Sequence, residues 1–143
     1  MPLQLEIVTP ERLAYSDEVD EVIVPGSEGE LGILPRHEPL VATLGLGELR
    51  IKKAGEWESF AVVGGFVQVR PDKVVVLAET ADLASDIDLE KAKAARQEAE
   101  RALEQGEREP ADLAAAQAAL QQALLQIRVA ERRYREGPRR PRG

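Results

Sequence analysis

The sequence has 143 residues, no cysteine and a formal net charge of −7. This length suits one ordinary domain or two very small ones, and the absence of cysteine excludes disulfide frameworks, thiolate metal sites and cysteine nucleophiles. The negative charge argues against general nucleic-acid binding, because a phosphate backbone would repel the chain.

The N-terminal stretch MPLQLEIVTPERL has no basic flank followed by an apolar run. Nowhere in the sequence do about 18 apolar residues follow one another without interruption, as a membrane-spanning helix would require. We therefore expect a soluble, cytosolic protein that associates with a membrane only through a partner.

Short runs of β-forming residues fill the chain from Leu3 to Glu79. Glycine and proline in the segments PGSEG, AGE and RPDK supply turn chemistry between the runs. Many short strands without intervening helices predict an antiparallel β-sandwich or flattened barrel over residues 1–86. The expected strands are residues 3–8, 19–25, 29–34, 40–44, 48–53, 56–63, 65–70 and 73–79.

After residue 86, alanine, glutamate, glutamine and arginine replace the β-formers. A helical period predicts helices over 87–105 and 110–136, which form an antiparallel two-helix hairpin within a second domain, 87–143. Asp86 or Asp88 can cap the first helix, Gly106 can end it, and Pro110 suits the first turn of the second. The fold class is therefore α+β. The expected apolar stripes are Leu89, Ala92, Ala95 or Ala99 and Leu103 in the first helix, and Leu113, Ala116, Leu120, Leu124, Ile127 and Tyr134 in the second.

The two predicted domains differ in charge. Residues 1–86 carry 7 Lys/Arg and 16 Asp/Glu, whereas residues 87–143 carry 12 and 10. Seven arginines crowd into the last sixteen residues, so the C-terminal end is a concentrated positive tip. The alanine-rich stripes bury little area per residue, so the hairpin is marginal by itself, either because it is small or because it is a switch.

No enzyme active site is visible in the sequence. His37 is the only histidine, and a lone imidazole beside a turn suits a structural or interface role better than general-base catalysis. Gly26, Gly29 and Gly32 lack the spacing of a phosphate-binding loop and favour a turn or bulge. Glu28 and Glu30 are interpreted as exposed acids. We therefore expect a non-catalytic protein that needs no cofactor and no metal.

Four segments together resemble the epsilon subunit of bacterial F-type ATP synthase. They are VDEVIVPGSEGELGILPRHEPLV from Val19 to Val41, VVGGFVQV from Val62, VVVLAETA from Val74 and IDLEKA from Ile87. The resemblance spans nearly the whole chain. It implies a β-sandwich followed by two C-terminal helices, in a rotor subunit that couples proton-driven rotation to ATP synthesis at the cytoplasmic face of the cell membrane.

The resemblance also implies partners and contact residues for the sandwich. The sandwich is expected to attach to the γ subunit and to the ring of c subunits. Glu28, Gly29 and Glu30 would form the loop that faces the polar loops of the c ring, with His37 in the neighbouring contact surface. A tight acidic turn without any partner is the alternative for these residues.

For the helices, the resemblance implies two states, one folded against the sandwich and one extended into the catalytic αβ ring, where it opposes ATP hydrolysis. The expected inhibitory contacts with the β subunit are Arg128, Arg132, Arg133 and Arg135, for which a solvated basic tail is the alternative. A weak ATP-binding motif would comprise Ile87, Asp88, Lys91 and Ala92, although Asp88 also fits ordinary helix capping. The positions expected to hold supporting arginines are instead Glu98, Gln122 and Gln126.

One function from another class stays open at the level of sequence. A β domain with a helical hairpin and a basic tip also suits a free-standing adaptor, or a transcription-associated factor whose hairpin inserts into a larger machine.

Overall fold

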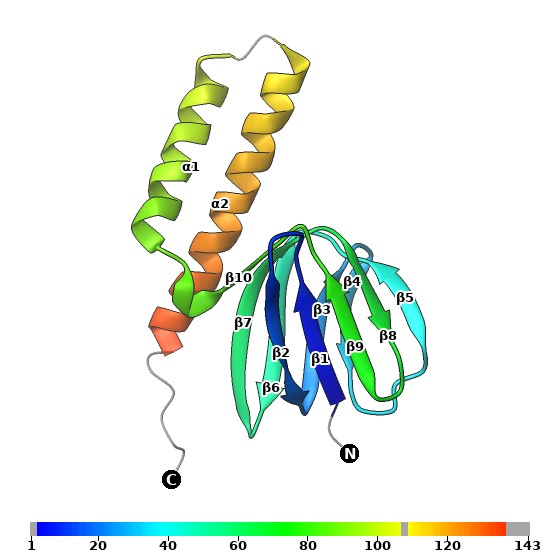
Figure 1. Ribbon diagram of the computed structural model, residues 1–143. Helices are drawn as coiled ribbons and strands as arrows, with labels where there is room; N and C mark the ends of the chain where they lie inside the picture. The colour runs from blue at the N-terminus through cyan, green and yellow to red at the C-terminus, as the bar shows by residue number, and fades with distance from the viewer. Residues whose placement is uncertain (1–2, 107–108, 137–143) are drawn as a thin grey trace. The chain divides into compact units, whose positions relative to one another are not determined.

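The computed structural model describes residues 3–106 and 109–136, and the side chains of 133–136 lie outside that description. The chain divides into two compact units, Met1–Ala84 and Ser85–Gly143. Among the described residues, the first contains ten strands and the second two α-helices, with a short 3-10 helix, Ala84–Asp86, between them in the sequence, which confirms the predicted fold class (Figure 1). The strands are β1 (Leu3–Val8), β2 (Leu13–Val19), β3 (Glu21–Gly26), β4 (Gly29–Ile33), β5 (Leu40–Thr43), β6 (Gly47–Lys53), β7 (Glu56–Val63), β8 (Phe66–Val69), β9 (Lys73–Leu77) and β10 (Thr80–Leu83).

The strands form two five-stranded sheets. Sheet I has the order β2-β1-β9-β8-β5, and sheet II has the order β10-β7-β6-β3-β4. Neighbouring strands are antiparallel except for β1 and β9, which run parallel with Leu5 opposite Val74 and Ile7 opposite Val76. This parallel pair places β1, from the start of the first unit, beside β9, from near its end. Since both strands lie inside sheet I, the N-terminal strand is not an edge strand.

Two strands were not predicted from the sequence. β2 has the sequence LAYSDEV, which contains alanine, serine and aspartate, residues that are poor strand formers. Pairing with β1 holds β2 in place. The turn between these two strands is closed by the Thr9 N–H, which donates to the Arg12 carbonyl at 2.9 Å. β10 follows the last expected strand, 73–79, and it pairs with β7. Both strands lie at sheet edges, where pairing to a single neighbour overrides weak propensity.

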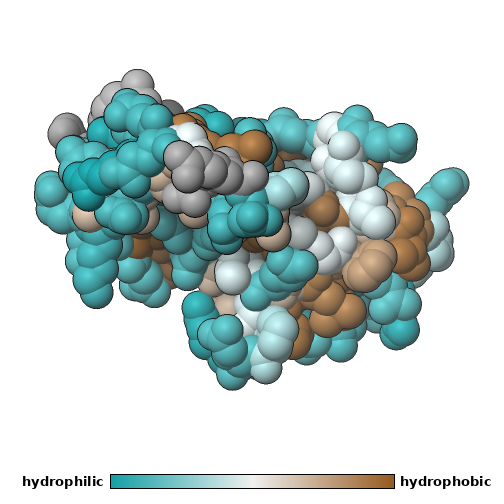
Figure 2. Space-filling view, turned by 90° about the horizontal axis from the view of Figure 1, so that it is seen from above, coloured by the Kyte–Doolittle hydropathy of each residue, from teal (hydrophilic) through white to brown (hydrophobic). Residues whose placement is uncertain are grey.

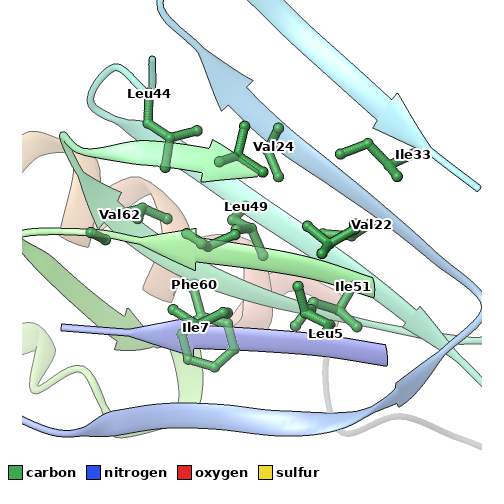
Figure 3. Packing of buried hydrophobic residues seen from close by; sticks show 14 of the residues in the cluster. Leu5, Ile7, Val22, Val24, Ile33, Leu44, Leu49, Ile51, Phe60 and Val62 are labelled. Carbon is green, nitrogen blue, oxygen red and sulfur yellow. The ribbon is translucent and has the colours of Figure 1, made fainter. Parts of the chain in front are cut away.

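The core lies between the two sheets and follows the strand period of two. Leu5 and Ile7 on β1 are fully buried, and Leu49 and Ile51 on β6 face them from sheet II (Figure 3). Close packing of such side chains contributes about 1.5–3 kcal/mol for each fully buried residue. The labelled core residues of Figure 3 are Leu5, Ile7, Val22, Val24, Ile33, Leu44, Leu49, Ile51, Phe60 and Val62.

Polar contacts connect β2 and the residue that follows it, Asp20, to the β6–β7 turn. Lys53 forms an ion pair with Asp17, and this hydrogen bond is the main reason why the pKa of Asp17 is lowered from its ordinary value. The Asp20 Oδ2 accepts from the Ala54 N–H at 3.0 Å. Beside them the Tyr15 ring meets Phe60 edge-on, with 5.8 Å between centroids. Burial, followed by the charges of Asp17 and Glu58, raises the pKa of Tyr15 to about 12.

The β6–β7 hairpin turns through two residues with positive φ. Ala54 has φ 52° and Gly55 has φ 80°, the combination that a type I′ turn requires. Glycine adopts this conformation freely, whereas alanine is strained in it by roughly 1–2 kcal/mol. The turn is therefore built on one suitable residue and one unsuitable one.

The second unit contains α1 (Leu89–Glu104) and α2 (Pro110–Glu136), which lie side by side in Figure 1. Asp88 caps α1, as expected, because its Oδ1 accepts from the Lys91 N–H at 3.1 Å. Of the alternatives for the α1 stripe, Ala99 is buried and Ala95 is exposed. None of the described helices has the length and apolarity needed to cross a bilayer.

The predicted stripe of α2 was partly wrong. Leu113 and Leu124 are exposed, and Tyr134 lies outside the described side chains. The face that is buried is richer in alanine than expected, because small side chains allow close approach of helices. The buried residues of α2 are Ala116, Ala123, Leu125, Ile127, Val129 and Ala130.

Candidate docking site

The acidic hairpin, residues 25–30, is the turn that joins β3 to β4. Gly26 lies opposite Gly29, with Ser27 and Glu28 forming the turn between them. A Cβ on Gly26 would lie 2.6 Å from the Gly29 carbonyl oxygen, and Gly29 has φ 131°. Gly26 leaves no room for a side chain, and the φ of Gly29 would strain any other residue although the space beside it is open, so the hairpin favours glycine at both positions.

This hairpin is fastened to sheet I through β5. The Ser27 N–H donates to the Thr43 carbonyl at 2.9 Å, and the two hydroxyl groups of Ser27 and Thr43 lie 2.5 Å apart. The Gly45 N–H donates to the Pro25 carbonyl, also at 2.9 Å. The tip is therefore a fixed part of the sandwich, and it can present side chains without first becoming ordered.

The two acids of the hairpin have different surroundings. Glu28 is exposed at the turn, and within the described residues it has no assigned ion pair. Glu30 is also exposed, but both of its carboxylate oxygens accept from Nη2 of Arg50 on β6, at 3.3 and 3.2 Å.

His37 lies in the loop between β4 and β5, beyond the other end of β4. The ring Nδ1 of His37 is 2.8 Å from the Glu38 carbonyl oxygen. The backbone N–H of His37 donates to the Leu34 carbonyl at 3.1 Å. β4 spans about 16 Å, at about 3.3 Å for each of its five residues, and it separates this loop from the turn formed by Ser27 and Glu28. The sequence-predicted contact residues are therefore found at two ends of one strand.

An apolar row, Leu13, Val8, Leu77 and Phe66, crosses the solvent-facing side of sheet I. In register, Leu13 lies opposite Val8, Val8 opposite Leu77, Leu77 opposite Phe66, and Phe66 opposite Thr43. Leu13 is 58% exposed, Leu77 49% and Phe66 53%. The row thus ends at Thr43, the residue that is bonded to the acidic hairpin.

The neighbouring position on β5 extends this surface. Val41 shares the solvent-facing side with Thr43 and is 69% exposed. In Figure 2 brown, apolar surface is open to solvent over the strand-rich unit, beside teal polar groups. Exposed apolar clusters on soluble proteins usually mark interaction sites.

Sequence reasoning missed this row, although the signal was present. The run KVVVL has apolar residues at successive positions, so both faces of β9 are apolar. A strand in a two-layer sandwich has only one face in the core, which leaves the other apolar face for a partner.

The residues of the proposed ATP motif lie at the start of α1. Asp88 is engaged in capping, Lys91 is exposed and Ala92 is buried. Glu98 occupies one of the positions at which ATP binding would require an arginine. Its carboxylate forms an ion pair with Arg101 at 3.2 Å. Among the residues that the structure describes, no group of three metal-ligating side chains occurs.

Of the four arginines proposed to inhibit, two have described side chains. Arg128 is exposed on α2 and Arg132 is half-buried. Arg133 and Arg135 belong to α2, but their side chains lie outside the described part of the chain.

Comparison with protein families matches both units. The β-sandwich domain of the ATP synthase delta/epsilon chain matches residues 2–84, and the long α-helix domain of the same chain matches residues 85–131. The chain belongs to the ATP synthase delta/epsilon chain family. This confirms the family expected from the hairpin and the three other segments.

Relatives in this family match almost from end to end. The ATP synthase epsilon chain of Desulforamulus reducens is 48% identical over 128 residues, which cover 90% of this chain and 96% of the relative. The epsilon chain of Halalkalibacterium halodurans is 48% identical over 130 residues, which cover 91% and 98%.

Two solved structures share the fold. A chain of the mitochondrial ATP synthase of Euglena gracilis has a TM-score of 0.67 at 22% identity, over 91% of this chain and 78% of that one. A chain from the central stalk and c-ring of the Tetrahymena thermophila enzyme has a TM-score of 0.57 at 16% identity, over 91% and 97%. The delta/epsilon family thus accounts for both units, which decides against the adaptor and transcription-factor alternative.

Proposed function

We propose that this chain is a non-catalytic subunit of the central stalk of an F-type ATP synthase. It couples proton-driven rotation of the c ring to ATP synthesis in the αβ ring, and it needs no cofactor. The observation that carries the proposal is the apolar row of sheet I, which ends at Thr43, the residue bonded to the turn of the acidic hairpin.

The two parts of this surface suit two kinds of contact. The apolar row is the part that buries area, and we assign it to the γ subunit. The acidic hairpin adds charge at the rim, which orients a partner more than it adds affinity, and we assign Glu28, Gly29 and Glu30 to the polar loops of the c ring. His37, beyond the other end of β4, belongs to a separate part of the rotor contact.

The helices have a regulatory role in this proposal. The unit formed by residues 87–143 opposes ATP hydrolysis when its arginines meet acidic groups of the catalytic β subunits. Its alanine-rich buried face suits two packing arrangements that differ by a few kcal/mol. Binding of ATP at Ile87, Asp88, Lys91 and Ala92 would be weak, because the expected supporting arginines are replaced by uncharged or acidic side chains that cannot hold phosphates. These replacements are Glu98, Gln122 and Gln126. The chain then lies at the cytoplasmic face of the cell membrane and is held there by the rest of the complex.

A truncation tests the proposal. Residues 1–86 are expected to unfold cooperatively and to co-purify with γ, because the core and the docking surface both lie in the first unit. The reconstituted complex with this fragment should synthesise ATP and should hydrolyse it faster than the complex with the full chain. A folded fragment that fails to bind γ would contradict the docking role, whereas unchanged hydrolysis would contradict the regulatory role alone.

A further inference from the structure

Glu30 and Arg50 are joined across an intervening strand. Arg50 is on β6, Glu30 is on β4, and β3 lies between these strands in sheet II. The Arg50 Nη2 lies 3.3 Å from Glu30 Oε1 and 3.2 Å from Oε2. The Glu30 carboxylate is therefore held toward the solvent-facing side of sheet II.

The arginine is itself supported from the opposite side. Its guanidinium carbon lies 6.0 Å from the ring centroid of Trp57 on β7, within the range of a cation–π contact. The Arg50 side chain is 31% exposed, against 61% for Glu30. An aromatic ring on β7 and a carboxylate on β4 thus both contact one guanidinium on β6.

Glu28 differs from Glu30 although the two are only two residues apart. It lies at the turn, is exposed, and has no assigned ion pair within the described residues. The charge of Glu30 is compensated by Arg50, whereas the charge of Glu28 is available to a partner. Two acids that look equivalent in the sequence GSEGE therefore have unequal roles.

We propose that Arg50 is a positioning residue that holds Glu30 against sheet II, so that Glu28 is the acid that meets cationic or N–H groups of the rotor partner. This inference rests on the docking role proposed above. Fixing the hairpin before association lowers the entropy cost of binding. The free charge of Glu28 accelerates the encounter through long-range attraction.

The binding test uses the full chain and an ATP synthase complex from which this subunit has been removed. Glu28→Gln should lower the association rate constant about threefold to tenfold at low salt and flatten its salt dependence. Glu30→Gln and Arg50→Met should each weaken binding about twofold to fivefold. The double variant with both changes should bind no more weakly than Arg50→Met alone, because each change breaks the same ion pair between Arg50 and Glu30.

The matched control is Glu28→Gln in the Arg50→Met background, where Glu28 should keep its full effect. If Glu30→Gln costs the same factor with and without Arg50, Glu30 contacts the partner directly and the positioning role is wrong. If Glu28→Gln changes neither rate nor affinity, Glu28 is not the docking acid and the inference is also wrong. Failure of the unaltered chain to rebind the complex would instead contradict the proposed function.

Fluorescence of the isolated chain gives a readout that needs no partner. Trp57 is the only tryptophan, and its ring centroid lies 6.0 Å from the Arg50 guanidinium carbon and 5.9 Å from Lys52 Nζ, so loss of the Arg50 contact should change its emission. Glu30→Gln should shift its emission or its quenching by acrylamide in the same direction as Arg50→Met, whereas Glu28→Gln should leave both as in the unaltered chain. An unchanged Trp57 signal in Glu30→Gln would mean that Glu30 does not hold the arginine, and it would overturn the inference.

Discussion

Replacing Val41, Phe66 and Leu77 together by serine is expected to weaken binding to the γ subunit about 150-fold. These side chains are already about one third to one half buried in the free sandwich, so roughly half of each remains to be covered by a partner. Complete burial of such a side chain contributes about 1.5–3 kcal/mol, so each supplies about 1 kcal/mol on docking. Three of them give about 3 kcal/mol, which corresponds to about 150-fold in Kd.

The assay is titration of γ with the full chain and with the triple variant. Gln68→Ser is the matched control, since Gln68 lies on the same side of β8, two residues from Phe66, and has little apolar surface to lose. Thermal unfolding of each variant shows whether the sandwich remains folded. A folded triple variant that binds γ as tightly as the unaltered chain would refute the assignment of the apolar row as a docking surface.

Four further predictions concern stability and regulation. Ala54→Asn should raise the free energy of unfolding by about 0.5–1 kcal/mol in urea titrations, because asparagine accepts positive φ before Gly55, whereas Gly55→Ala should lower it. The hydrogen bond from Lys53 lowers the pKa of Asp17 below its ordinary value of 3.8. The ion pair of these residues therefore contributes fully to the free energy of unfolding above that pH, and its contribution is lost as the pH falls through the folded-state pKa of Asp17. The melting temperatures of Asp17→Asn and the unaltered chain should therefore differ near neutrality and converge in strong acid. Asp88→Ala should cost the helical unit about 1 kcal/mol, measured by circular dichroism, and Asp86→Ala should cost less, because only Asp88 caps α1. Hydrolysis by the reconstituted complex should rise in a fourfold alanine variant, and high salt should remove the difference, because a Debye length of about 8 Å shrinks to about 3 Å at 1 M. The arginines replaced in that variant are Arg128, Arg132, Arg133 and Arg135.

The parts of the fold that sequence could predict are those with strong local chemistry. Pro110, Gly106 and the aspartate at position 88 placed the helix ends within two residues of those observed. The strand β2 was missed because LAYSDEV has weak propensity, and its conformation comes from pairing with β1. The parallel pairing of β1 with β9 was also out of reach, since it depends on which distant strand completes sheet I.

The hairpin acids and the apolar row show why a docking site is only half visible in sequence. The acidic hairpin is contiguous, so its glycines and glutamates could be found together in one short segment. The row is assembled from four strands, and each contributes a single side chain that looks like ordinary core. Register alone aligns these side chains, and burial alone separates Phe66, which faces solvent, from its neighbour Val67, which is fully buried. A one-residue shift in any of these strands would turn that strand's contribution into the core and break the row, although its composition would be unchanged. The sequence KVVVL could thus indicate an outward apolar position on β9, but the row that we assign to γ is specified by the pairing of the strands.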